Sequence, residues 1–344
     1  MATKGISARM ISTADVAVDE VFARVGLVVG RSPAMREVVA MVRQVASRPA
    51  ATVLLQGESG TGKDVIARAI HDLGSRAPYQ FVAINCAAVP ETLFETELFG
   101  VEAGAFTDAK ATRAGYLLRA DGGTLFLDEI GAMSLNVQAK LLRFLESRSF
   151  RRVGGMKELH VNLRVIAATN ADLRAAVAQK LFREDLFYRL QVITLTLPPL
   201  RERPEDIALL ISHFLRVLHT DDMPSVQMSG EALQLLQRYS WPGNVRQLLG
   251  VIQRAQIVCD GQVIGARDLP EEVRKAESSA LTRLREAQER LELPPEGMDL
   301  PVFLRAIERT FIQQALERCH GNQVQAAALL HLTRDQLRYR LSHQ

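Results

Sequence analysis

Cysteine, tryptophan and long hydrophobic runs are scarce in this chain of 344 residues. The three cysteines, Cys86, Cys259 and Cys319, lie far apart, with no CxxC pair and no histidine pair at metal-binding spacing. This excludes a disulfide framework and a zinc site, and it fits a reducing compartment in which the cysteines only pack. No run of about 18 or more apolar residues occurs, and no apolar secretion signal opens the chain. We therefore expect a cytoplasmic protein with no membrane contact.

A large excess of charge of one sign is also absent. The net charge is +3, while 24% of the residues are charged and 47% are hydrophobic. This composition is typical of a globular protein rather than a disordered one. Any surface that binds nucleic acid must therefore be local. The length fits about two to three domains of ordinary size.

Short apolar runs rich in β-branched and aliphatic residues alternate with helical patterns in the first part of the chain. The runs lie at residues 52–57, 81–85, 124–128, 164–169 and 192–197. Nearly continuous apolar runs are typical of strands covered on both faces, and strand–helix alternation predicts a parallel α/β sheet. After Pro198 and Pro199 the strand pattern stops, and the following segment predicts only helices.

The shifts in pattern predict five regions. The first is too short to form a core of its own, and the fourth is a linker that begins as a charged helical stretch and ends in helix-breaking prolines and glycine. The regions are an N-terminal extension (1–27), an α/β domain (28–203), a helical domain (204–270), the linker (271–301) and a C-terminal helical domain (302–344).

The C-terminal region predicts three short helices. The first helix is predicted from an apolar stripe at helical spacing. The residues of this stripe are Leu304, Ile307, Phe311 and Ala315. Gly321 is placed to end this helix, and Asn322 is placed to cap the second. Thr333 and Gln336 have the capping-box spacing for a third, basic helix. Two helices around a tight turn, the last one basic, predict a helix-turn-helix, with a generic three-helix bundle as the alternative.

Residues 57–64 have the sequence GESGTGKD between a predicted strand and a predicted helix, which is the context of a phosphate-binding loop. Backbone N–H groups of such a loop surround phosphate oxygens, and Lys63 would bring positive charge to the β and γ phosphates. Asp64 stands where Ser or Thr usually contacts Mg²⁺, and its carboxylate can serve the metal. The alternative is a glycine-rich turn without a ligand. The predicted nucleotide-binding residues are Gly57, Glu58, Ser59, Gly60, Thr61, Gly62, Lys63 and Asp64.

Two carboxylates end the predicted strand at 124–128. Asp128 and Glu129 follow a buried apolar run, and ligands bind at the carboxyl ends of strands in α/β sheets. Asp128 would hold Mg²⁺ together with Asp64, and Glu129 would polarise the water that attacks the γ phosphate. The pair is common in sequences, but its position after a phosphate-binding loop makes it informative.

Over nearly its whole length the chain resembles the sigma-54-dependent AAA+ transcriptional activators, or bacterial enhancer-binding proteins. The motifs that carry the resemblance are GESGTGKD (57–64), INCAA (84–88), ELFGVEAGAFTDA (97–109), GGTLFLDEIG (122–131), RVGG (152–155), LRVIAATN (163–170), FREDLFYRL (182–190), LPPLRERPEDI (197–207) and WPGNVRQL (241–248). A Fis-like helix-turn-helix closes the chain. The resemblance implies an AAA+ parallel sheet, an all-α lid and a small all-α DNA-binding domain, with no regulatory domain before residue 28.

The resemblance also implies roles for residues outside the phosphate-binding loop. Asn85 matches the residue that switches the catalytic glutamate according to nucleotide state. Thr169 and Asn170 match the sensor of the γ phosphate, and Arg246 matches the second sensor, in the lid.

Two arginines lie where the family has arginine fingers. Arg183 and Arg189 would reach the neighbouring subunit's site and complete it in a ring oligomer, expected to be a hexamer formed from dimers. Taken singly, each arginine would instead be read as part of a surface salt bridge. The implied ligands are ATP and Mg²⁺.

One motif departs from the family. The family has GAFTGA on a loop that presents its Phe and Thr to sigma-54, and this chain has GAFTDA at 104–109. Phe106 and Thr107 are present as the expected sigma-54 contacts. Asp108 replaces a glycine, which adds negative charge and removes a residue that tolerates positive φ.

The implied function is ATP-driven activation of transcription, in which the chain binds enhancer DNA and remodels closed complexes of sigma-54 RNA polymerase. One alternative is a related AAA+ DNA-binding regulator that does not engage sigma-54 because of Asp108. A metabolic P-loop kinase is a third class, and it leaves the DNA-binding end unexplained. Regulation is expected from outside: by expression level, by a partner protein acting in trans on the AAA+ surface, or by a co-activator subunit. The predicted DNA-binding residues are Thr333, Arg334, Gln336, Arg338 and Arg340.

Overall fold

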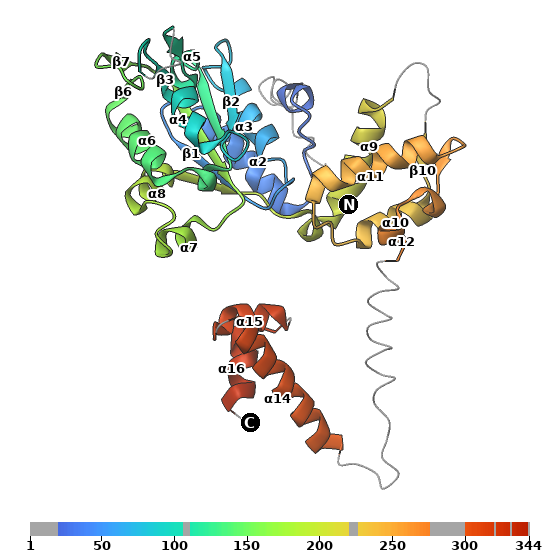
Figure 1. Ribbon diagram of the computed structural model, residues 1–344. Coiled ribbons are helices and arrows are strands. Elements are labelled where there is room, and N and C mark those ends of the chain that lie inside the picture. The colour runs from blue at the N-terminus through green and yellow to red at the C-terminus, as the bar shows by residue number, and fades with distance from the viewer. Residues whose placement is uncertain are drawn as a thin grey trace, which may run out of the picture. The chain divides into compact units, whose positions relative to one another are not determined.

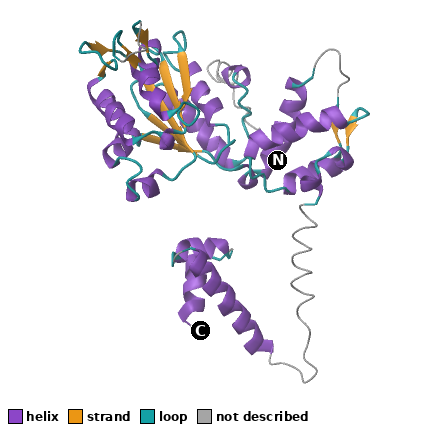
Figure 2. Ribbon diagram, in the orientation of Figure 1, coloured by secondary structure: helices purple, strands orange, loops and turns teal. Residues whose placement is uncertain are grey.

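The computed structural model describes residues 20–105, 111–219, 226–275, 300–319, 321–330 and 332–342. The chain divides between Glu277 and Ser278 into two compact units, and each is described by itself (Figure 1). The first holds a parallel sheet with its helices and a helical lid, and the second is entirely helical in its described residues (Figure 2).

A five-stranded parallel sheet in the order β2-β5-β8-β1-β9 forms the centre of the first unit. Its strands are β1 (Val53–Gln56), β2 (Phe81–Asn85), β5 (Thr124–Asp128), β8 (Arg164–Thr169) and β9 (Ile193–Thr196). Each coincides with one of the apolar runs, so the predicted α/β sheet is confirmed. Strand β8, buried at all its residues, is the central strand of the five, which explains the continuous apolar run from Val165 to Ala168.

Helices cover both faces of the sheet because successive strand residues point to opposite sides. In β1, Val53 and Leu55 join one core with α2 (Pro33–Ala46) and α3 (Lys63–Asp72), while Leu54 joins the opposite core. The helices of that opposite core are α4 (Glu91–Phe99), α5 (Tyr116–Arg119), α6 (Leu135–Ser147), α7 (Leu173–Ala178) and α8 (Glu184–Leu190).

Two antiparallel pairs were not predicted from the sequence. They are β3 (Gly100–Val101) with β4 (Arg113–Ala114), and β6 (Ser149–Arg151) with β7 (Glu158–His160). Val101 also bridges Val153, so the two pairs adjoin. Strands of two or three residues are too short to show a repeating apolar pattern.

The lid follows β9 and consists mainly of helices around a core that includes the fully buried Trp241. Its elements are η2 (Leu200–Glu202), η3 (Pro204–Asp206), α9 (Ile207–Val217), α10 (Gly230–Arg238), α11 (Asn244–Val258), η4 (Ala266–Asp268) and α12 (Glu271–Arg274). The expectation that strands stop after Pro199 is wrong in one detail. A short parallel pair, β10 (Gln227–Met228) with β11 (Val263–Ile264), joins two lid loops. The charged helical stretch predicted beyond α12 lies, from residue 276 to 299, outside the described residues.

A buried carboxylate fastens the start of the sheet domain to the lid. Asp206, 1% exposed, accepts hydrogen bonds from Arg31 N (2.6 Å), Ser32 N (2.9 Å) and Ser32 Oγ (2.6 Å). A Cβ on Gly30 would lie 2.2 Å from Asp206 Oδ2, so this approach requires glycine.

We expect Asp206→Ala to reduce the free energy of unfolding by about 3 kcal/mol, because it leaves buried donors without their acceptor. Asp206→Asn should cost less, since its amide oxygen still accepts. The exposed N-cap change Asp172→Ala is the comparison, with an expected loss of about 1 kcal/mol. Urea unfolding measures all three, and equal losses for Asp206→Ala and Asp172→Ala would contradict the role of burial.

The second unit contains α14 (Leu300–Arg318), α15 (Gln323–Leu329) and α16 (Arg334–Ser342). Asn322 Oδ1 caps α15 by accepting from Val324 N and Gln325 N, as predicted. Thr333 and Gln336 form the predicted reciprocal capping box at 3.0 and 3.2 Å.

The predicted apolar stripe of α14 is wrong at Phe311, which is 56% exposed. Ile312, its neighbour in the sequence, lies in the core with Ala315 instead. One residue is a rotation of about 100° around a helix, so the buried face is displaced from the stripe. The side chains of Leu304 and Ile307 lie outside the described part of the unit.

Candidate nucleotide-binding site

Four neighbouring strands deliver the predicted site residues to one edge of the sheet. Strands β2, β5, β8 and β1 are adjacent and parallel, so their carboxyl ends meet at that edge. Gln56, which precedes the loop, is in register with Thr169, and Asn85 is in register with Asp128. The fold therefore brings together residues that lie more than 100 positions apart in the sequence.

The loop at 57–62 joins β1 to α3. Lys63 is only 6% exposed, and its Nζ donates to the carbonyl oxygens of Gly57 (2.8 Å) and Glu58 (3.1 Å). Burial lowers the pKa of Lys63, and the carboxylates of Glu129 and Asp128 oppose this shift. The lysine is thus a desolvated positive charge held against the loop and facing the acidic end of β5.

Asp128 and Glu129 form that acidic end. Asp128 Oδ1 accepts from the backbone N of Glu129 at 3.0 Å, and Glu129 has a left-handed backbone with φ 54°. This conformation turns the chain sharply after the strand and is uncommon for a non-glycine residue. Strained backbone of this kind occurs often at functional sites.

The oxygen donors at this end suit Mg²⁺. The ion is usually bound through one or two carboxylates together with substrate phosphates. Asp128 ends β5, and Asp64 lies exposed in the first turn of α3, next to Lys63. Within the described ranges no group of three or more His, Cys, Asp or Glu side chains is placed to hold a metal ion without such a phosphate.

The remaining predicted residues of this edge are placed as follows. Asn85 Oδ1 accepts from Ala87 N (2.9 Å) and Ala88 N (3.1 Å), so the side chain here caps its own loop. Thr169 is buried, and its Oγ1 accepts from Ala171 N at 3.0 Å, while Asn170 is exposed beside it.

The start of α11 lies directly on the phosphate-binding loop. Arg246 Nη1 donates to Ser59 Oγ at 3.0 Å, and the backbone N of Val245 donates to Gly60 O at 2.9 Å. Gly60, with φ +76°, has no room for a side chain, because a Cβ would lie 2.4 Å from Gly243 O. The predicted lid sensor is therefore brought to the loop.

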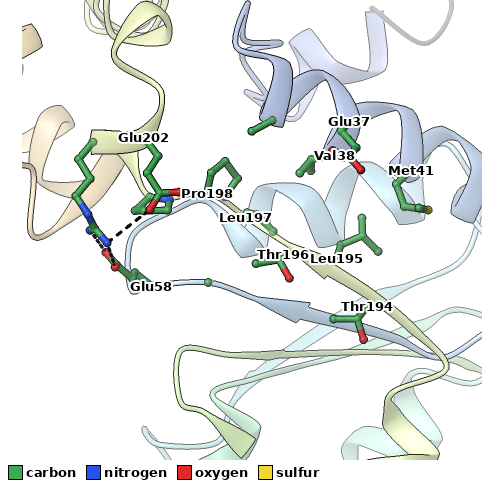
Figure 3. Close-up of a pocket in the computed structure, with 14 residues that line it drawn as sticks. Glu37, Val38, Met41, Glu58, Thr194, Leu195, Thr196, Leu197, Pro198 and Glu202 are labelled. Carbon is green, nitrogen blue, oxygen red and sulfur yellow. Dashed lines mark hydrogen bonds and ion pairs between the residues drawn. The ribbon is translucent and has the colours of Figure 1, made fainter. Parts of the chain in front are cut away.

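Sequence reasoning missed three further lid residues that contact the loop. They are Arg201, Arg203 and Asn244. All three lie in motifs quoted for the family resemblance, yet nothing in their spacing indicates which loop group each contacts. Arg201 forms a bidentate ion pair with Glu58 at 2.7 and 2.8 Å, marked by dashed lines in Figure 3.

A cavity of about 600 Å³ borders the loop on the side of β9. Figure 3 shows Glu58 at one end, Thr194 to Leu197 along the edge strand, and Glu37 and Met41 on α2. Glu58 is thus part of the loop, but its carboxylate is directed to Arg201 and the lid rather than to Lys63.

The two predicted arginine fingers have hydrogen-bond partners outside the phosphate-binding loop. Arg183, 42% exposed in its side chain, makes a bidentate pair with Asp185 at 2.7 and 3.0 Å. Arg189 Nη2 donates to Leu145 O at 3.1 Å. Neither arginine is hydrogen-bonded to the loop at 57–64, all of which is described.

The predicted sigma-54 contacts Phe106 and Thr107, and Asp108 beside them, lie outside the described residues. The chain on either side of them is held firmly. Glu102 accepts from Arg152 (3.1 Å) and from Thr112 Oγ1 (3.0 Å), and Glu102 N donates to Val153 O at 3.0 Å.

The predicted DNA-binding residues lie on α16 and its cap. Arg334 and Arg338 are exposed, whereas Thr333 and Gln336 are exposed but bonded to each other. Arg340 differs, because it pairs with Glu308 on α14. Leu337, on the same helix, is fully buried and belongs to the core of the unit.

A phosphate-binding loop on a five-stranded parallel sheet, with a helical lid seated on that loop, defines an AAA+ nucleotide-binding protein. Three family models match the chain: the sigma-54 interaction domain at 28–196, the AAA+ ATPase lid domain at 201–285, and the bacterial regulatory protein, Fis family, at 303–343. The chain belongs to the sigma-54-dependent AAA+ transcriptional activators. Across its described parts, no helix has the length and apolar character needed to span a membrane.

Relatives agree with this assignment. The chain is 45% identical over 317 residues to the regulatory protein AtoC of Escherichia coli (strain K12), covering 92% of this chain and 67% of that protein. It is 43% identical to the transcriptional regulator NtrC of Azospirillum brasilense, covering 91% and 68%. The crystal structure of NtrX from Brucella abortus in complex with ATP superimposes with a TM-score of 0.66 at 31% identity, covering 95% of this chain and 71% of that one.

Proposed function

We propose that this chain hydrolyses ATP to activate transcription, binding enhancer DNA through α16 and remodelling closed complexes of sigma-54 RNA polymerase. The observation that carries the proposal is the placement of Lys63, Asp128 and Glu129 at one sheet edge, on the same chain as a sigma-54 interaction domain and a Fis-type helix-turn-helix. The bound ATP of NtrX supports the choice of nucleotide.

The site's own residues suggest how hydrolysis proceeds. Lys63 draws charge from the β and γ phosphates, and Glu129 accepts the proton of the water that attacks the γ phosphorus as the bond to the β-phosphate oxygen breaks. Asp128 and Asp64 would hold Mg²⁺, which supplies charge neutralisation when bound. Asn85, Thr169, Asn170 and Arg246 would report the state of the nucleotide.

Completion of the site requires a neighbour. Arg183 and Arg189 are exposed and are not hydrogen-bonded to the loop of their own chain, so we propose that they act on the next subunit in a ring, as a hexamer. Ring assembly from a heterologous interface is the usual geometry for such sharing. A regulatory protein acting in trans would control this assembly.

The test for the sigma-54 part uses purified sigma-54 and a transition-state nucleotide analogue. Wild type should bind sigma-54 only with the analogue, Thr107→Ala should lose that binding, and Asp108→Gly should change its affinity while leaving ATP turnover within about twofold. If all three proteins fail equally to bind sigma-54 while hydrolysing ATP, the alternative regulator that does not engage sigma-54 replaces this part of the proposal.

Arg334→Ala and Arg338→Ala should weaken binding to DNA. If the arginines contact phosphates, each change should reduce the slope of log affinity against log salt by about 1. Arg309→Ala, an exposed arginine on α14, is the matched control and should leave the slope unchanged. Fluorescence anisotropy over a salt series measures this, and equal slopes in all variants would place the DNA contact elsewhere.

A further inference from the structure

Lid residues donate hydrogen bonds to an acceptor on each of four consecutive loop residues, 58–61. The acceptors are the side-chain carboxylate of Glu58 and the backbone carbonyls of residues 59–61. The carboxylate of Glu58 accepts from Arg201 and, at 3.1 Å, from Asn244 Nδ2. Ser59 O accepts from the same Nδ2 at 3.0 Å. Gly60 O accepts from Val245 N and Arg246 N, and Thr61 O accepts from Arg203 Nη2 at 3.2 Å.

Asn244 is the centre of this arrangement. It is fully buried, and its backbone is left-handed with φ 51°. Its Oδ1 accepts from Leu200 N at 2.7 Å, while its Nδ2 donates to both Glu58 and Ser59. One amide therefore joins the start of the lid, the start of α11 and the phosphate-binding loop. A left-handed backbone and a side-chain amide that both accepts and donates hydrogen bonds are more typical of a functional site than of a residue that only begins a helix.

These hydrogen bonds hold the loop carbonyls, and this determines where the loop N–H groups that contact phosphate point. A phosphate-binding loop contacts phosphate through its backbone N–H groups, and each peptide unit holds its C=O and N–H on opposite sides. Fixing the carbonyls of Ser59, Gly60 and Thr61 on the lid side therefore fixes the N–H groups that follow them on the other side. The loop is preorganised by the lid.

We infer that Asn244 and Arg201 are positioning residues for nucleotide binding, acting through Glu58 and the carbonyls of residues 59–61. This inference rests on the proposed ATPase function and adds to it. The hydrogen bonds from Arg201 and, to a smaller extent, from Asn244 also lower the pKa of the Glu58 carboxyl.

The experiment measures the Kd of a fluorescent ADP analogue, and kcat and KM for ATP, in full-length variants. Arg201 and Glu58 are 44% and 43% exposed, so changes there should leave the fold intact. We expect Arg201→Met to raise Kd and KM about tenfold while kcat falls less than about threefold. Glu58→Gln keeps an acceptor for both partners and should lose clearly less than Glu58→Ala.

Asn244→Ala should raise Kd most, since it removes two donors to the loop, and its melting temperature without nucleotide is recorded to separate unfolding from weak binding. The matched control is Glu231→Gln, an exposed carboxylate on α10. Unchanged Kd in Arg201→Met, or a fall in kcat at constant KM, overturns the inference. A wild-type chain that binds no nucleotide overturns both proposals, whereas wild-type binding with unaffected variants overturns only this one.

Discussion

Lys63→Ala should abolish ATP turnover and raise the Kd for ATP by at least about 100-fold, because it removes the desolvated charge that faces the phosphates. In the structure Lys63 Nζ lies on the carbonyls of Gly57 and Glu58, within the electrostatic reach of Asp128 and Glu129. DNA binding by the second unit should stay intact. The proposed DNA contacts lie on α16 in that unit, whereas Lys63 and the nucleotide site lie in the first unit. ATPase assays and nucleotide titration measure the first effect, and DNA anisotropy measures the second.

Glu129→Gln, directly after the end of β5, is the variant to compare with Lys63→Ala. The amide is nearly isosteric but cannot accept the proton of the attacking water, so binding should persist while hydrolysis is lost. Equal loss of ATP affinity in both variants would contradict this division of roles. Normal turnover in Lys63→Ala would remove the nucleotide assignment altogether.

The parallel sheet and the loop could be predicted because buried parallel strands and a glycine-rich loop leave strong local patterns. The run at 164–169 is apolar from Val165 to Ala168, and β8 is indeed buried at all its residues. The caps at Asn322 and Thr333 were also predictable, since each is a contact between residues two or three positions apart. The exposure of Phe311 was not predictable. Apolar residues at helical spacing mark one side of a helix, but they do not show which of several neighbouring apolar residues packs into the core.

Contacts between distant segments are the part that the sequence does not encode locally. Asn244 meets Glu58 across 186 positions, and Asp206 meets Ser32 across 174. Asparagine at the start of a helix is usually a cap, so the residue type alone favours that role for Asn244, the first residue of α11. The hydrogen bonds of Asn244 and Val245 to the loop, and the close approach of Gly60 to Gly243, are seen only once the chain is folded.

Arg183→Ala should lower the ATPase rate by about 10³–10⁵-fold if the guanidinium completes a neighbour's site. Its free energy of unfolding should stay close to that of wild type, because the pair with Asp185 is exposed and screened by solvent. Arg174→Ala, an exposed arginine on α7, is the matched control and should change neither quantity. Activity per subunit of wild type should rise with protein concentration as rings form.

Mixing two inactive variants separates a shared site from a site within one chain. An Arg183→Ala subunit keeps Glu129, and a Glu129→Gln subunit keeps Arg183, so each inactive protein supplies what the other lacks. In randomly mixed rings about a quarter of the sites would pair an intact glutamate with a neighbour's intact arginine, and activity should return to a comparable fraction of wild type. Sites completed within one chain would stay inactive at every mixing ratio. A mixture with no activity, formed under conditions where light scattering shows mixed rings, would therefore exclude Arg183 as the residue that one subunit lends to the next.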